Sequence, residues 1–510
     1  MHDSAPPAAG PDHEVVVVGG GFSGIGAAIA LKRVGIDDIA VLEAGDGVGG
    51  AWHWNTYPGV AVDIPSFSYQ FSYAQQADWS RVYAPGGELK AYAEHCVDRY
   101  DLRPHVRLNT RVTGARFDDE QHHWTLDTAD GDTITARHVI GATGVLTQPK
   151  PPAIPGLEDF AGRTVHTARW DHDLDLRGKR VAVIGTGASA VQLIPSIAPD
   201  VEHLTVFQRT PIWCLPKPDA PLAAPLRTVL RRVPGARWAL RAASQAYVEL
   251  TFPIAAHFAG IVPLAAGSER LALSHLRRQV RDPAVREKLT PRYSLGCKRP
   301  SFSNEYLPAF NRANVALETS AIERITPEGV QTSDGTVHAV DVLVLATGFK
   351  VFEAGNMPPF AVTGSGGADL DAFWTENRFQ AYEGVSVPGF PNFFTILGPY
   401  GYNGASYFTL IENQMRHIVR CLQHARTRDA TRVEVTPEAN ARYFAQMLGR
   451  RHRQVFFRGS CSTANSYYFD VNGDVPFRAS PTLEAAWRSA RYDLDDYRFD
   501  RAAVPATAAV

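Results

Sequence analysis

Two segments of the chain repeat one pattern, in which a run of β-branched residues ends in glycines and continues as an Ala- and Leu-rich stretch. The first reads EVVVVGGGFSGIGAAIALKRVG from Glu14 to Gly35, and the second reads RVAVIGTGASAVQLIPSIA from Arg180 to Ala198. A strand that passes through G-x-G-x-x-G into a helix is the dinucleotide-binding turn of a Rossmann-like domain. The repeat therefore predicts an α/β protein with two Rossmann-like dinucleotide-binding domains.

The first turn carries the three glycines Gly19, Gly21 and Gly24. They allow a tight turn and let a pyrophosphate approach the helix N-terminus, where free N–H groups and the helix dipole favour an anion. Glu43 ends the next strand, IAVLEAG, and its carboxylate can accept hydrogen bonds from ribose hydroxyls. This combination favours FAD, and the alternative is a glycine turn in an ordinary α/β fold.

The second turn has Gly185 and Gly187, with Ala190 as the permitted variant of the third glycine. At the position that corresponds to Glu43 stands Arg209, whose guanidinium suits a 2′-phosphate better than a free hydroxyl. Thr210 offers a further hydroxyl, so this site is predicted to bind NADPH; a surface arginine at a strand end is the alternative. We assign three more residues of the turn and the start of the helix to the same site: Thr186, Ser189 and Gln192.

The domain order follows from two similar strands, HVIGATG (138–144) and VLVLATGF (342–349), which each end in Ala-Thr-Gly. We expect the chain to leave the first domain after the first of them, through the Pro-rich linker 149–152, and to return at the second. The predicted parts are a flexible leader 1–13, an FAD domain 14–148 and 346–510, and an inserted NADPH domain 155–342 with a helical excursion 215–295.

Composition excludes several other classes. A net charge of −2 and a pI near 6.8 give no basic surplus for nucleic acid. The five cysteines form no C-x-x-C, which favours a reducing, cytoplasmic location without a redox dithiol, and no metal site is expected. His122-His123 fits a solvated loop, and the apolar run 252–266 is shorter than the ~20 residues that span a bilayer, so we expect a buried or interfacial helix there.

A segment after the linker, FAGRTVHTARWD, resembles the Baeyer–Villiger monooxygenase fingerprint F-x-G-x-x-x-H-x-x-x-W followed by Pro or Asp. The matching residues are Phe160, Gly162, His166, Trp170 and Asp171. Two more segments resemble this family, GAWHWNTYPGVAVD (50–63), expected to lie against the flavin, and CKRPSFSNEYLPAFNRANV (297–315). The family usually has arginine where this chain has Thr56, and the tail 465–478 departs from the well-known cyclic- and aryl-ketone enzymes.

The resemblance implies an oxidoreductase in which NADPH reduces FAD, O2 adds to give a C4a-peroxyflavin, and attack on a ketone yields an ester or lactone. It implies that Arg299 is the cation beside the reacting oxygen, that Asp63 orients it, and that Lys298 joins Arg209 at the 2′-phosphate. His166 and Trp170 would couple NADPH binding to domain movement rather than act as a base. Residues expected near FAD besides Asp63 and the first turn are Gly50, Trp52, Tyr57, Val112 and Gly398.

The expected partners are a small apolar ketone and O2, with no integral membrane segment. Two other functions stay open from the sequence. One is N- or S-oxygenation of a soft nucleophile, which the tryptophan of the fingerprint and the Lys298-Arg299 pair disfavour. The other is a flavin-binding redox sensor or interaction module that no longer turns over.

Overall fold

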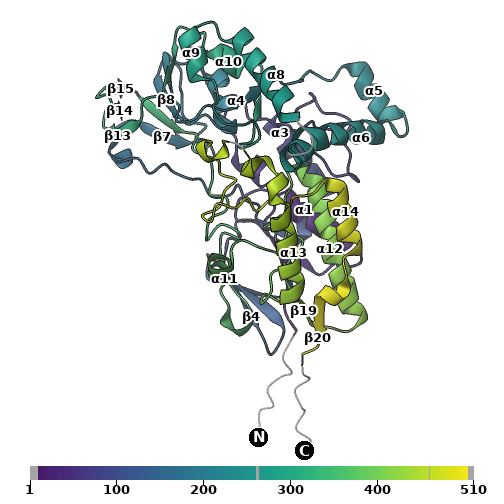
Figure 1. The fold of residues 1–510 in the computed structure, drawn as a ribbon. Helices are drawn as coiled ribbons and strands as arrows, with labels where there is room; N and C mark the ends of the chain where they lie inside the picture. The colour runs from purple at the N-terminus through teal and green to yellow at the C-terminus, as the bar shows by residue number, and fades with distance from the viewer. Residues whose placement is uncertain (1–9, 260–263, 459, 503–510) are drawn as a thin grey trace, which may run out of the picture.

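The computed structural model describes residues 10–259, 264–458 and 460–502. Residues 1–9 of the expected leader lie outside this part, whereas His13, its last residue, already belongs to the first strand. The described chain forms two sheets with helices around them, joined by long connections (Figure 1).

The first sheet has eight strands in the order β17-β4-β5-β6-β1-β2-β3, with β18 paired to β6. Its centre is parallel, because β1 pairs in parallel with both β2 and β6, while β4, β5 and β6 form the expected antiparallel meander. The strands are β1 His13–Val18, β2 Ile39–Leu42, β3 Val106–Arg107, β4 Val112–Asp118, β5 His123–Thr128, β6 Thr133–Gly141, β17 Ala361–Thr363 and β18 Phe393–Thr395.

Strand β1 is buried on both faces, and its successive side chains point alternately to one face and the other. Val15 and Val17 pack into a core cluster with the helices α1 (Phe22–Lys32) and α12 (Tyr407–Thr427). Val16 and Val18 pack into a second cluster on the other face, with residues of the meander and of the C-terminal part of the chain. The C-terminal half of the chain thus completes the first sheet's layers.

The second sheet is entirely parallel, in the order β12-β9-β8-β16-β7. Its strands are β7 Arg163–His166, β8 Arg180–Ile184, β9 His203–Phe207, β12 Val315–Glu318 and β16 Val342–Leu345. Helices α4 (Ala188–Ile197) and α10 (Tyr306–Ala309) cover one face, and the small sheet β13–β15 (322–339) lies on the other. Strand β16 belongs to this sheet, so the chain crosses back after Leu345.

Between β9 and β12 the chain runs through the helices α5 (Ala224–Arg232), α6 (Ala236–Glu249), α8 (Leu264–Gln279) and α9 (Pro283–Lys288). Leu230 and Val248 of this stretch belong to the core cluster of the first sheet. Helices α5 and α6 therefore contact the first domain, and in Figure 1 α6 runs inward above α14 (Thr482–Arg491) while α5 lies farther out.

Two expectations need correction or a limit. His122 is buried, not solvated, because it folds under the tail and its Nδ1 lies 2.8 Å from the Thr431 hydroxyl. In the apolar run 252–266, Phe252 and Ala256 are buried, while residues 260–263 lie outside the described part. Among the helices that the structure describes, none is long and apolar enough to cross a membrane.

Candidate active site

The first glycine turn packs against the end of β6. Gly19 has a φ of +114°, and a Cβ on it would stand 2.7 Å from the carbonyl oxygen of Ala142. A Cβ on Gly24 would overlap the carbonyl oxygen of Gly19 itself. Helix α1 begins after Gly21, where no side chain caps it, so the amides of its first turn are open to an anionic group.

Glu43 directly follows β2, beside this turn, and is buried. Its two carboxylate oxygens accept hydrogen bonds from the amides of Gly20, at 2.6 Å, and Gly45, at 2.8 Å. Because each carboxylate oxygen can accept more than one bond, both keep capacity for a ribose hydroxyl. The turn and the carboxylate together fit the pyrophosphate and ribose of a dinucleotide.

The second turn repeats this geometry. Gly185 has a φ of +113°, and a Cβ on it would stand 2.5 Å from the carbonyl oxygen of Ala346. Each Ala-Thr-Gly segment therefore packs against the first glycine of one of the two turns. Helix α4 begins after Gly187, again without a side-chain cap, and a Cβ on Gly187 would meet nothing within 4 Å. This open space fits a second pyrophosphate.

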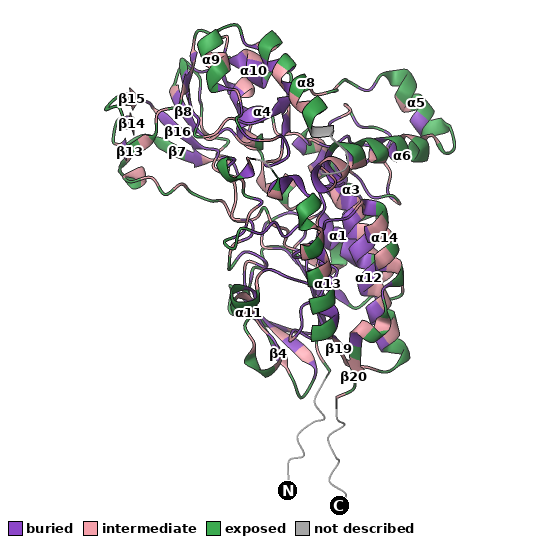
Figure 2. Cartoon of the chain, in the orientation of Figure 1, coloured by how far each residue is buried: buried purple, intermediate pink, exposed green. Residues whose placement is uncertain are grey.

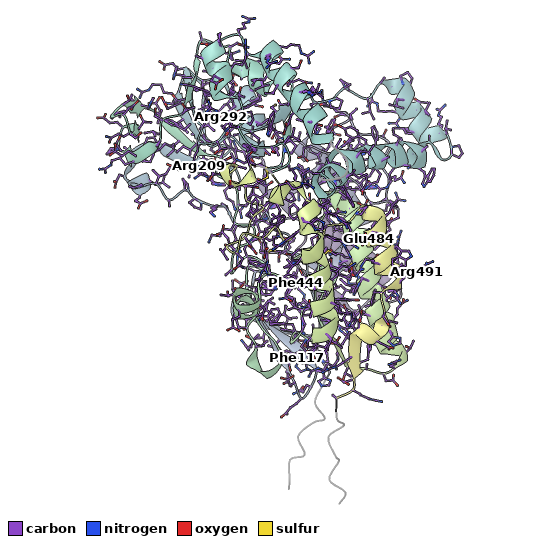
Figure 3. All side chains as sticks on the ribbon, in the orientation of Figure 1. Phe117, Arg209, Arg292, Phe444, Glu484 and Arg491 are labelled. Carbon is purple, nitrogen blue, oxygen red and sulfur yellow. A yellow bond between two sulfur atoms is a disulfide. The ribbon has the colours of Figure 1, made fainter. Side chains whose placement is uncertain are left out.

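Arg209 follows the end of β9 at the mouth of the second turn and is exposed, beside the C-terminal segment (Figure 3). Burial first and the Arg209 charge second lower the pKa of Lys298 to about 8. Thr210 accepts a hydrogen bond from Asn465 at 2.8 Å, and its carbonyl accepts one from Thr186 at 3.0 Å. The charges of Arg209 and Lys298 thus act on each other.

Arg299 and Asp63 form a two-point ion pair. The Nε of Arg299 donates to one carboxylate oxygen of Asp63 at 2.7 Å, and an Nη donates to the other at 2.9 Å. Burial raises the pKa of Asp63, but Arg299 outweighs burial and holds it below its usual value. Burial lowers the pKa of Arg299, and Asp63 reverses this to well above the usual value, so both groups stay charged. The hydroxyl of Tyr402 accepts a third bond from Arg299 at 3.2 Å.

A cavity of about 660 Å³ runs from the first glycine turn to helix α4, which follows the second turn. Its walls are mostly apolar, which suits an organic ligand with few polar anchors. It brings together these predicted residues: Gly19, Gly21, Glu43, Gly50, Trp52, Tyr57, Asp63, Val112, Ser189, Gln192, Arg299 and Gly398. Other predicted residues lie outside its lining: Gly24, Gly185, Thr186, Gly187, Ala190, Arg209, Thr210 and Lys298.

Tyr57 joins the two domains. Its ring packs in the core cluster of the second sheet, and its hydroxyl donates to Gln192 of α4 at 2.8 Å. Gln192 in turn donates to the carbonyl of Ala61 at 2.8 Å. The segment 50–63, expected to lie against the flavin, therefore also forms hydrogen bonds with α4, the helix that follows the second turn.

The fingerprint segment runs along β7, at the edge of the second sheet. Burial, reinforced by Arg169, lowers the pKa of His166 to about 4, so the ring is neutral near pH 7. Its Nε2 lies 3.3 Å from the hydroxyl of Thr347, in the second Ala-Thr-Gly segment. Asp171 pairs with Arg163, and Trp170 packs against the core of the second sheet. Within the described part of the chain, none of the five fingerprint residues lines the cavity.

Sequence reasoning missed several aromatic residues around Arg299. Tyr402, Tyr467 and Tyr468 line the cavity. The guanidinium carbon of Arg299 lies over the ring of Phe252, 5.7 Å from the ring centre. The departure of the tail at 465–478 was a signal for Tyr467 and Tyr468 only, and nothing in the sequence indicated Tyr402 or Phe252. Thr56, the departure from the family arginine, pairs with His172 at 2.8 Å.

Cys297 and Cys461 form a disulfide, which the reducing location expected from the sequence did not predict. They lie 164 residues apart, so no spacing in the sequence reveals the pair. Cys297 directly precedes Lys298 and Arg299, so the bond ties this segment to the C-terminal part of the chain. Cys96, Cys214 and Cys421 are free and buried. Among the described residues there is no group of three or more potential metal ligands.

Two glycine turns, of which the first lines the cavity and the second leads into a helix that lines it, together with an arginine–aspartate pair in the cavity wall, define a flavoprotein of the two-dinucleotide type. The family model described as pyridine nucleotide-disulphide oxidoreductase matches residues 16–225. A Baeyer-Villiger monooxygenase of Streptomyces coelicolor is 38% identical, over 96% of this chain and 93% of that protein. The chain belongs to the Baeyer–Villiger monooxygenase family.

Solved structures agree with this assignment. A structure of OTEMO in complex with FAD and NADP superposes with a TM-score of 0.85 at 28% identity, covering 96% of this chain and 100% of that one. An oxidized steroid monooxygenase bound to NADP gives a TM-score of 0.84 at 31% identity, with coverage of 96% and 100%.

Proposed function

We propose that this protein is an FAD-dependent monooxygenase that uses NADPH and O2 to insert one oxygen atom next to a ketone carbonyl, giving an ester or lactone. Relatives named Baeyer-Villiger monooxygenase and structural neighbours with bound FAD and NADP support this reading over N- or S-oxygenation and over a protein without turnover. The observation that carries it is the Arg299–Asp63 pair in the wall of an apolar cavity that reaches from the first turn to helix α4.

We assign FAD to the turn at Gly19–Gly24 with Glu43, and NADPH to the turn at Gly185–Ala190. Bound FAD, once reduced by NADPH, supplies the activation of O2. The domain division that goes with this assignment is 14–148 and 346–510 for FAD and 155–342 for NADPH. The two separate sheets and the open N-termini of α1 and α4 support it.

We assign to Arg299 the stabilisation of negative charge on oxygen during the reaction. A guanidinium stays charged at any working pH and has fixed donors, and in a site closed to water such a cation is worth more than in solution. Asp63 holds the plane of the guanidinium through two bonds, and Tyr402 fixes its third edge. The remaining guanidinium donors are available to the reacting oxygen.

The substrate we propose is a small apolar ketone, in keeping with the apolar and aromatic walls next to Arg299. Because NADPH is an intracellular reductant, we place the enzyme in the cytoplasm, where the Cys297–Cys461 disulfide is exposed to a reducing environment.

The function is tested with purified protein loaded with FAD, mixed with NADPH and a panel of apolar ketones under 18O2. We expect ketone-dependent NADPH consumption and one ester or lactone per NADPH, identified by mass spectrometry with one oxygen from 18O2. Reduction by NADPH that returns only H2O2, with every ketone unchanged, would reject the assignment.

Replacing Arg209 with glutamine should raise the KM for NADPH roughly tenfold, since a charge-assisted bond to the 2′-phosphate is lost. kcat should change little, because the phosphate lies far from the chemistry, and the preference for NADPH over NADH should fall accordingly. Steady-state kinetics with both coenzymes measure this. Arg292→Gln is the matched control, an exposed arginine of the same domain that pairs with Glu287. Equal preference in the Arg209 variant and the parent protein would remove Arg209 from the site.

The KM for NADPH should rise by up to about tenfold between pH 7 and 9.5, because Lys298 is charged only below its lowered pKa of about 8. The coenzyme phosphate is already a dianion above pH ~7, so it adds no titration in this range. Lys298→Arg should flatten the profile, and NADH, which has no 2′-phosphate, should show no such rise. A profile that Lys298→Arg leaves unchanged would contradict the role of Lys298.

A further inference from the structure

Helices α5 and α6 form an arm that projects from the body of the protein, mostly exposed (Figures 1 and 2). The exposed face of α6 and the residue after it is almost free of polar groups. Trp238 is 70% exposed and Leu250 is 52% exposed. The exposed residues between 237 and 250 are Arg237, Trp238, Ala239, Ala242, Ala243, Ala246, Tyr247 and Leu250. Seven of these eight side chains are apolar, whereas the solvated face of a helix is normally polar.

The apolar surface continues on both sides of α6. In and just after α5, Leu226, Val229 and Val233 are 41%, 43% and 50% exposed, and their spacing places them on one face. At the other end, the backbone amide of Thr482 donates to Glu249 at 2.9 Å, which holds the start of α14 beside the end of α6. There α14 exposes Leu483, at 82%, and Trp487, at 58%. We call these residues of α5, α6 and α14 the arm face.

The arm also carries a local charge opposite to that of the whole protein. Between residues 221 and 248 the sequence has five arginines and neither Asp nor Glu, although the net charge of the chain is −2. Their positions are 227, 231, 232, 237 and 241. Arg231 pairs with Asp78, and Arg241 is buried and donates to the carbonyl of Gln70. On α5, Arg227 and Arg232 flank the apolar face on opposite sides, as the spacing of a helix requires.

Apolar side chains bordered by arginines fit the boundary between lipid headgroups and acyl chains, where the apolar groups insert and the cations meet phosphates. A second copy of the chain fits less well, because a symmetric contact would place the arginines of one arm against those of the other. We propose that the arm face docks on an anionic phospholipid membrane surface, without spanning it. The apolar class of ketone in the proposed function also partitions into lipid, but the docking does not depend on that function.

The test is sedimentation of the FAD-loaded protein with vesicles of phosphatidylcholine, with and without about 30 mol % phosphatidylglycerol. We expect binding to the anionic vesicles, weakened at high salt, with a blue shift of the tryptophan fluorescence. Trp238→Ser/Leu250→Ser should lose at least about ten times in affinity without a change in melting temperature, because both side chains are more than half exposed. Arg227→Gln/Arg232→Gln should lose binding to anionic vesicles in the same way.

Val337→Ser is the matched control, since Val337 is 45% exposed on β15 (Val337–Ala339), at the far end of the other domain. It should bind vesicles as the parent protein does. The proposal falls if the parent protein binds neither vesicle, or if it binds both equally. It also falls if light scattering finds a dimer in solution that Trp238→Ser/Leu250→Ser dissociates, which would make the arm face a subunit interface. These readouts need no turnover, so they stay separate from failure of the proposed reaction.

Discussion

Replacing Arg299 with alanine should reduce ester or lactone formation by about 10²- to 10³-fold, the range found when a preorganised donor to a developing oxyanion is removed. NADPH should still be oxidised in air, because the coenzyme turn and its cations are intact, but the oxygen should leave as H2O2. The measurement is product and H2O2 per NADPH consumed. Tyr402→Phe is the graded control, since it removes only the 3.2 Å bond to the guanidinium. We expect a loss within about tenfold for this variant.

The alanine variant also leaves the Asp63 carboxylate in the cavity wall without its partner, which lowers stability apart from any effect on catalysis. Because Asp63 is about a third exposed, we expect a cost of about 1–2 kcal/mol. The double variant Arg299→Ala/Asp63→Ala removes both charges. It should regain much of the melting temperature but none of the activity. An Arg299→Ala enzyme that keeps coupled ester formation within tenfold of the parent protein would show that another group supplies the charge.

The sequence predicts best those parts of the site that local backbone rules determine. The first glycine of each turn is needed because a Cβ there would clash with a backbone carbonyl oxygen. Glu43 and Arg209 hold corresponding positions because the chain contains the same strand–turn–helix unit twice. The Arg299–Asp63 pair joins segments 236 positions apart, and only the family resemblance predicted it. Local rules alone could not have placed these two side chains together.

What the sequence could not predict depends on long-range packing. The disulfide of Cys297 and Cys461, the bond of Tyr402 to Arg299 and the burial of His122 all arise where the C-terminal part of the chain folds back over both sheets. No period or motif in the tail encodes these contacts. The sequence likewise did not predict the apolar arm face, because alanines and a tryptophan at helical spacing usually indicate a buried face. Only the exposure of α6 distinguishes a surface from a core.

Replacing Gly24 with alanine should abolish retention of FAD and lower the melting temperature by roughly 5–10 °C. The added Cβ would overlap the backbone oxygen of Gly19, so α1 would have to move away from β1 at a cost of about 3 kcal/mol. The second turn carries Ala190 at the corresponding position, fully buried, which means that its helix stands far enough from its strand to admit a Cβ. The distance between helix and strand therefore differs between the two turns, although both have the same motif.

Gly87→Ala is the control for the glycine substitution, because a Cβ on this residue of helix α3 (Gly86–Arg99) meets nothing within 4 Å. Its melting temperature should stay the same or rise slightly, since alanine stabilises a helix by up to about 1 kcal/mol relative to glycine. Flavin absorbance after gel filtration and thermal unfolding measure both variants. If Gly24→Ala retained a full complement of FAD at the parent's melting temperature, the close approach of α1 to β1 would not be needed for the first turn. The presence of Ala190 in the second turn would then indicate no difference in helix–strand distance between the two turns.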